Sequence, residues 1–274
     1  MFFVELGRRK VPALGFGTWA LSGASCAQMV ETALAIGYRH IDTAQAYDNE
    51  AEVGRAIAQS RIPRGEIFLT TKVWRESLRA AQVLSSVEQS LARLGTGYVD
   101  LLLIHWPHAE IPVAETLGAM ARLKAEGKIK AIGVSNFTVR QMQEAVAHLG
   151  HEIVCNQIEY HLLLSQRLVL DYARAHGIAA VAYCPLARGR LMQHPAVLRV
   201  AKRCGKSANQ VALRWLLEQQ GVSAIPKTSS PAHARENFAI FDFALDADDR
   251  RALDALPGGT RLVNPGWAPA WDAA

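Results

Sequence analysis

The chain has 274 residues, 50% of them hydrophobic and 20% charged, which is typical of a globular protein and excludes a disordered or fibrous one. A chain of this length can bury a substantial core without disulfide or metal staples. Because α/β barrels reach about 250 residues as one unit, we expect a single domain over residues 1–274.

The formal net charge of +5 and the isoelectric point of about 9.1 indicate a basic surface that faces water. No long Lys/Arg tract with interleaved aromatics occurs, so we expect no nucleic-acid partner. A field that attracts an anionic cofactor or substrate is a further interpretation, and the motifs below favour it.

The cysteines and the apolar runs indicate the compartment. None of Cys26, Cys155, Cys184 and Cys204 forms a C-x-x-C pair or a zinc spacing. Two of them, Cys155 and Cys184, lie in apolar runs, so we expect buried free thiols in a reducing compartment. The N-terminus lacks a signal-peptide core, and the longest apolar run, residues 178–187, is too short to cross a bilayer. We therefore expect a soluble, cytoplasmic protein with no membrane partner.

Short apolar runs alternate with longer stretches of helical spacing along the chain. The expected strands are residues 14–17, 39–42, 67–72, 99–105, 129–135, 153–159, 178–183 and 222–227. The clearest expected helices are residues 28–36, 81–94, 117–126, 166–176 and 209–219. Ser165 and Ser207 are the expected N-caps of the last two helices. Eight strands that alternate with helices predict a parallel sheet closed into a (β/α)8 barrel, and residues 2–11 predict a β-hairpin that caps its bottom.

Polar side chains of catalytic types stand where the expected strands end. They are Asp42, Lys72, His105, Ser135, Asn136, Gln157, Tyr183 and Lys227. In a (β/α)8 barrel these strand ends meet on one face. Strands that simply stop where polarity begins would explain one or two such residues but not the whole set, so we expect them to surround one pocket.

Asp42, Tyr47 and Lys72 form a candidate proton-donating unit. The pKa of a free tyrosine is too high for easy proton donation at neutral pH. A nearby ammonium lowers that pKa, and a carboxylate beside the lysine holds it in place. His105 can orient a substrate carbonyl by a hydrogen bond. Each residue alone is usually structural, but together at successive strand ends they predict a catalytic site.

With these four residues the chain resembles the aldo-keto reductases, whose catalytic tetrad is similar to Asp42, Tyr47, Lys72 and His105. The similarity extends over essentially the whole chain, including GFGTW at 15–19, HWP at 105–107, GVSNF at 133–137 and IPKTS at 225–229. Within the family the chain is most similar to the bacterial 2,5-diketo-D-gluconate reductases of the B type, which also reduce methylglyoxal. The tail that begins RLVNP at 261–265 supports this closer match.

The resemblance implies an enzyme that transfers hydride from NADPH to a carbonyl carbon while Tyr47 protonates the oxygen. It implies small substrates, namely methylglyoxal, 2,5-diketo-D-gluconate-like acids and aromatic aldehydes, and a monomer. The implied cofactor contacts are Ser135, Asn136 and Gln157 at the carboxamide, Tyr183 on the nicotinamide ring, Leu186 and Arg188 over the pyrophosphate, Lys227, Thr228 and Ser229 at the 2′-phosphate, and Glu236 and Asn237 at the adenine.

The sequence departs from the family at His233, where many NADPH-preferring members carry arginine. An arginine fork is always charged and binds phosphate through two hydrogen bonds, and a histidine does not replace it. We therefore expect NADPH as cofactor, with NADH as a weaker alternative. The helix that begins near Pro231 also favours a phosphate at its N-terminus.

Tryptophans are expected at the mouth of the pocket. Trp19, Trp74 and Trp106 follow strand ends, and aromatics at the top of a barrel often line a binding site. The tail after Leu256 carries Trp267 and Trp271 and is expected to fold over the pocket as a partial lid.

Two other interpretations are weaker. His105 and His108 have metal-like spacing, but Pro107 lies between them and no carboxylate set accompanies them, so we expect no metal. A barrel that binds NADPH as a non-catalytic regulatory subunit is the alternative function, and the intact tetrad argues against it.

Overall fold

The computed structural model describes residues 1–7 and 9–272. The chain begins with a hairpin in which β1 (Phe3–Leu6) pairs antiparallel with β2 (Arg9–Pro12), which confirms the expected hairpin apart from residue 8, which lies outside the described residues. Its inward side chains Val4, Leu6 and Val11 pack in one cluster with residues near the starts of the later strands. The hairpin therefore covers the amino-terminal end of the main sheet.

The main sheet contains eight parallel strands in sequence order. They are β3 (Phe16–Gly17), β4 (His40–Asp42), β5 (Phe68–Val73), β6 (Val99–Ile104), β7 (Ile129–Ser135), β8 (Ile153–Glu159), β9 (Ala179–Tyr183) and β10 (Val222–Ala224). Each falls within, or differs by one residue from, an expected run. Every residue of β5, β6 and β8 is buried, as expected of parallel strands covered on both faces.

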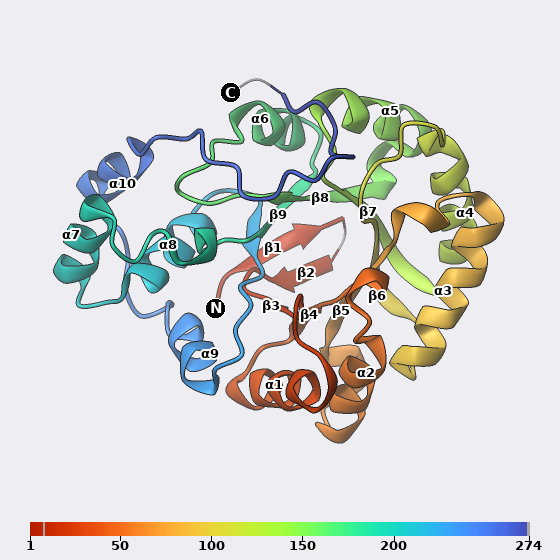
Figure 1. Cartoon of the computed structure of the whole chain (residues 1–274), viewed down its shortest axis with the longest axis horizontal. Coiled ribbons are helices and arrows are strands. Elements are labelled where there is room, and N and C mark those ends of the chain that lie inside the picture. Colours follow the sequence, from red (N-terminus) through yellow and green to blue (C-terminus); the bar gives the residue numbers. More distant parts are fainter. Residues whose placement is uncertain (8, 273–274) are drawn as a thin grey trace.

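Backbone hydrogen bonds join the first strand to the last. Gly15 N donates to Ala224 O at 2.8 Å, and Ala224 N donates to Ala13 O at 2.8 Å. Gly17 N donates to Pro226 O at 3.0 Å, and a Cβ at Gly17 would lie 2.8 Å from a carbonyl oxygen of this last segment. Because β3 and β10 meet in this way, the sheet curls round, and the helices surround it (Figure 1).

The helices follow the strands in alternation. They are α1 (Gly23–Ile36), α2 (Glu50–Gln59), α3 (Ala80–Leu94), α4 (Val113–Ala125), α5 (Val139–Leu149), α6 (Arg167–Ala175), α7 (Pro195–Cys204), α8 (Ala208–Leu217), α9 (Pro231–Phe238) and α10 (Ala247–Asp254). All five expected helices are present. Among the described residues, no helix has the length and apolar character needed to span a membrane.

One of the two expected N-caps is right and one is wrong. Ser207 caps α8, and its hydroxyl accepts from Gln210 N in a capping box. Ser165 does not cap α6, whose N-cap is Gln166. The reason is a contact with the C-terminal tail, because Ser165 N donates to Gly258 O at 2.7 Å and its Cβ lies close to that glycine.

Candidate active site

A cavity of about 630 Å³ opens at the carboxyl ends of the strands, and we call it the central cavity. Most of the expected site residues line it: Trp19, Asp42, Tyr47, Trp74, His105, Trp106, Ser135, Asn136, Gln157, Tyr183, Leu186, Arg188 and Lys227. Lys72 is fully buried beneath the cavity floor. It donates hydrogen bonds to Asp42 and Tyr47, which line the cavity. The convergence of these strand ends follows from the parallel sheet.

A network of hydrogen bonds holds Lys72 under the cavity. Its Nζ donates to Asp42 Oδ1 at 2.5 Å, to the Thr43 carbonyl at 2.9 Å and to Tyr47 Oη at 3.3 Å. The other oxygen of Asp42 accepts from Gln157 Nε2 at 2.8 Å. Since Gln157 belongs to β8, the ion pair is fixed from three strands and its carboxylate has no freedom to turn away.

The turn η1 (Gln45–Tyr47) presents the Tyr47 phenol to Lys72. Asn49 fixes this turn, because its amide donates to two backbone carbonyls of the β3–α1 loop and accepts from Thr43 Oγ1 at 2.6 Å. Gln45 adds a further tie through its Oε1, which accepts from Trp74 N at 2.9 Å. The position of the phenol is therefore set by polar side chains within the same loop rather than by packing alone.

Burial and Lys72 act on Tyr47 in opposite directions. Burial raises the pKa of the Tyr47 phenol, and the ammonium of Lys72 lowers it by a smaller amount, so the net shift is upward. Lys72 lowers the pKa of the phenol as the sequence predicts, but burial, which the sequence does not show, outweighs it. Burial alone would lower the pKa of Lys72, but Asp42 and Tyr47 more than offset it and the pKa is raised. Lys72 thus stays charged beside a protonated phenol.

His105 is neutral at physiological pH. Burial and the charge of Lys72 hold the pKa of His105 well below its ordinary value. Its Nδ1 is buried and has no hydrogen-bond partner among the described residues. The ring stands edge-on to Tyr47 and Trp74, with centroids 5.6 and 5.1 Å away. A neutral imidazole in this place can donate one hydrogen bond to a carbonyl oxygen without adding charge to the cavity.

The ends of β7, β8 and β9 are locked together on the other side of the cavity. Tyr183 Oη donates to Asn136 Oδ1 at 2.7 Å, and Asn136 Nδ2 donates to the His105 carbonyl at 3.0 Å. Ser135 Oγ donates to the Gln157 carbonyl at 2.8 Å. Asn136 adopts a left-handed backbone with φ of 63°, which asparagine tolerates better than most residues. These hydrogen bonds join the amides and the tyrosine ring into one wall of the cavity.

A second cavity of about 560 Å³ adjoins the first, and we call it the side cavity. Leu186 and Lys227 line both cavities. Six expected residues line the side cavity: Leu186, Lys227, Thr228, His233, Glu236 and Asn237. Ser229 lines neither and faces solvent, so the structure does not bring it into the expected group. The two cavities together form an elongated site with a basic outer end.

Several residues at these cavities were not singled out from the sequence. Cys184 was expected to be a buried thiol, but it is only half-buried, lines the central cavity and has a left-handed φ of 49°. Its place directly after Tyr183 at a strand end was the available signal. Lys202 and Asn209 line the side cavity from α7 and α8, and the buried Asn209 Oδ1 has no hydrogen-bond partner within residues 1–7 and 9–272. No local pattern distinguishes these two from ordinary helix residues.

The C-terminal tail lies against the mouth of the central cavity, as expected. Val263 lines the cavity. The ring of Trp267 meets that of Trp74 edge-on at 6.4 Å, and the ring of Trp271 meets that of Trp106 at 6.1 Å. The tail therefore forms part of the cavity wall rather than a free extension.

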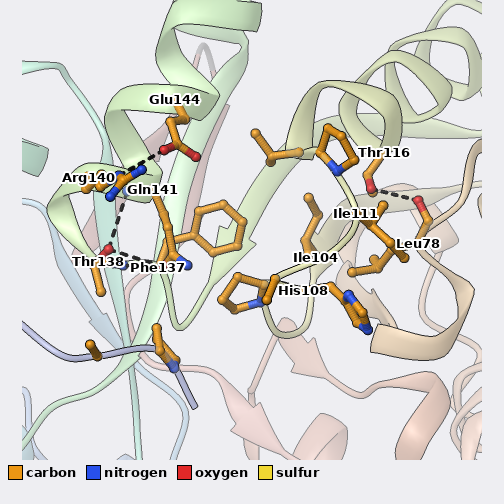
Figure 2. Close-up of a pocket in the computed structure, with 16 residues that line it drawn as sticks. Leu78, Ile104, His108, Ile111, Thr116, Phe137, Thr138, Arg140, Gln141 and Glu144 are labelled. Carbon is orange, nitrogen blue, oxygen red and sulfur yellow. Dashed lines mark hydrogen bonds and ion pairs between the residues drawn. The ribbon is translucent and has the colours of Figure 1, made fainter. Parts of the chain in front are cut away.

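A third cavity of about 370 Å³ lies on the outer side of the strand ends, between the starts of α4 and α5 (Figure 2). Its apolar lining includes Ile104 and Phe137, which directly adjoin His105 and Asn136 in the chain. At its edge, Arg140 and Glu144 form an ion pair with each other. It contains none of the expected site residues.

Comparison with known proteins places the chain among carbonyl reductases. A model of the aldo/keto reductase family matches residues 13–257. Methylglyoxal reductase DkgB of Salmonella typhi is 42% identical over 266 residues, which cover 96% of this chain and 99% of that protein. DkgB of Escherichia coli O157:H7 shows the same identity and coverage. A crystal structure assigned as a 2,5-diketo-D-gluconic acid reductase B has 47% identity and a TM-score of 0.97, and covers 100% of this chain and 98% of its own.

Proposed function

Because the chain belongs to the aldo/keto reductase family, we propose that it reduces small aldehydes and ketones with NADPH, as one domain built on a closed (β/α)8 barrel. The observation that carries the proposal is the unit of Asp42, Lys72 and Tyr47 at the cavity floor, with His105 beside it. The complete unit argues against a non-catalytic subunit. Methylglyoxal, 2,5-diketo-D-gluconate-like acids and aromatic aldehydes are the proposed substrates.

The proposed mechanism assigns one task to each side chain. Hydride comes from the nicotinamide of the cofactor when it is bound. Tyr47 donates its phenolic proton to the carbonyl oxygen as negative charge develops there. Lys72, 3.3 Å from Tyr47 Oη, stabilises the phenolate that remains, and its raised pKa keeps it charged for that purpose. Neutral His105 holds the carbonyl oxygen by a hydrogen bond and directs it toward the phenol.

The two adjoining cavities fit a dinucleotide. The side cavity offers cationic side chains for a phosphate, and Asn209 Oδ1, which has no partner in the described part of the chain, can accept from a donor group of a ligand. We propose that Ser135, Asn136, Gln157 and Tyr183 hold the nicotinamide end, that Leu186 and Arg188 cover the pyrophosphate, and that Lys227, Thr228, Ser229, His233, Glu236 and Asn237 hold the adenosine end. Ser229 is the weakest member of this set, because it faces solvent.

A spectrophotometric screen tests the proposed reaction. We expect methylglyoxal, nitrobenzaldehyde and 2,5-diketo-D-gluconate each to oxidise NADPH faster than NADH in the presence of the protein. The physical reason for this substrate class is a cavity whose lining is largely apolar around the unit of Asp42, Lys72 and Tyr47. A protein that binds NADPH but reduces none of the three would contradict the proposal.

His233 offers a specific test of the cofactor. We expect His233→Arg to increase NADPH affinity about tenfold and to leave NADH affinity unchanged, because a guanidinium binds the extra phosphate through two charge-assisted hydrogen bonds. Fluorescence titration of each cofactor measures both affinities. Arg235→Ala is the control, since Arg235 lies on the same helix but lines neither cavity. An equal change for the two cofactors would show that position 233 does not contact the phosphate.

A further inference from the structure

Glu159, a buried acid with no task in the proposed mechanism, binds the C-terminal tail. It is the last residue of β8 and is 0% exposed. Its Oε1 accepts from Leu262 N at 2.7 Å, and its Oε2 accepts from Val263 N at 2.8 Å. Hydrogen bonds to a carboxylate are stronger than those between neutral groups, and the accepting carboxylate is fully buried here.

His161 completes the shell of Glu159. Its Nδ1 accepts from Leu163 N at 3.2 Å, so its proton lies on Nε2, which donates to Glu159 Oε1 at 3.0 Å. The same loop holds the tail by its backbone, since Thr260 N donates to Leu163 O at 2.7 Å. Hydrogen bonds of Gly258, Thr260, Leu262 and Val263 to β8 and the loop after it therefore fix the beginning of the tail, which we call the strap (residues 258–272).

A second carboxylate fixes the other end of the strap. Asp272 Oδ2 accepts from Val139 N at 2.9 Å, at the first residue of α5, where the helix dipole favours a negative charge. Trp271 Nε1 donates to Asn264 Oδ1 at 2.8 Å, and the Trp271 ring lies under the Arg261 guanidinium at 3.8 Å. In Figure 1 the dark blue tail passes over β8 and ends beside α5, so the strap crosses the strand ends between two anchors.

We propose that Glu159 is a positioning residue that sets the size of the substrate pocket through the strap. It does not line the central cavity, but Val263, whose amide it binds, does. With both ends held by carboxylates, the strap is a fixed wall that admits small carbonyl compounds and excludes bulky ones. The proposal rests on the proposed function, because it concerns the substrate of the same cavity.

Glu159→Gln tests the hydrogen bonds between Glu159 and the strap without changing a residue that lines the central cavity. The retained oxygen can still accept from Leu262 N and from His161. The new amide nitrogen faces Val263 N. Because both groups are donors, that hydrogen bond is lost, and the strap is held about tenfold more weakly at this anchor. We expect faster hydrogen exchange of the strap amides and about a tenfold rise in kcat/KM for a bulky aromatic aldehyde relative to methylglyoxal. NADPH affinity should stay within about twofold of the wild-type value.

Two further variants complete the experiment. Asp272→Ala removes the acceptor for Val139 N, releases the opposite anchor and should shift the substrate ratio in the same direction, even if Glu159→Gln does not fold. Glu152→Gln, an exposed carboxylate paired with Lys124, should change neither exchange nor ratio. Unchanged strap exchange in both anchor variants would overturn the anchoring. Faster exchange with the native substrate ratio would overturn the control of pocket size. Wild-type turnover of methylglyoxal with NADPH tests the proposed function separately, because exchange does not depend on it.

Discussion

Tyr47→Phe is expected to reduce kcat by about two orders of magnitude or more and to leave NADPH affinity intact. The phenol is the proposed proton donor, and phenylalanine keeps the ring while it removes the hydroxyl that accepts a hydrogen bond from Lys72. Without the phenol, negative charge must develop on the carbonyl oxygen of the substrate with no acid beside that oxygen. Steady-state kinetics with methylglyoxal, together with a fluorescence titration of NADPH, measures both quantities.

Tyr160→Phe is the matched control for this variant. Tyr160 is buried, and its hydroxyl donates to Gln219 Oε1 at 2.6 Å, outside the three cavities. We expect a modest loss of stability and wild-type turnover. Near-normal turnover of Tyr47→Phe would remove Tyr47 from the role of general acid, whatever the control shows.

Lys72→Met is expected to damage stability and turnover together. It leaves the buried Asp42 carboxylate without its cation, and breaking a buried pair from one side costs about 3–5 kcal/mol. It also removes the charge that stabilises the Tyr47 phenolate, so we expect kcat to fall by about two orders of magnitude. Urea unfolding at neutral pH and steady-state kinetics measure the two effects.

The double variant Asp42→Asn, Lys72→Met separates these two effects. Removing both charges eliminates the unpaired carboxylate, so stability should recover in part while turnover stays low. Lys124→Met, which breaks an exposed pair with Glu152, should change stability by less than about 1 kcal/mol. If Lys72→Met unfolds at the wild-type urea concentration, the buried pair does not stabilise the protein as described.

The strands and the floor of the site could be predicted from the sequence, because both depend on local pattern. Eight apolar runs define the sheet, and once the strands are parallel their polar ends must meet on one face. Asp42, Tyr47 and Lys72 therefore come together as expected, and Lys72 is buried because its strand is covered on both sides.

Features that depend on contacts across long sequence distances could not be predicted. Ser165 looks like a helix cap, yet the tail occupies its backbone amide, and nothing near Ser165 indicates this. Glu159 is one more polar residue at a strand end until the tail, 103 residues later, is seen to bind it. The net shift of the Tyr47 pKa depends on how deeply the folded chain buries the ring, which no motif states.

The hydrogen bond between Asp42 and Gln157 has a consequence for synthesis on the ribosome. The two residues are 115 positions apart, which corresponds to roughly ten seconds of translation. During that interval Asp42 and Lys72 have already emerged, but β8 has not, and the strand that joins β3 has yet to be made. The nascent chain therefore carries a half-built polar centre in an open sheet with an exposed edge.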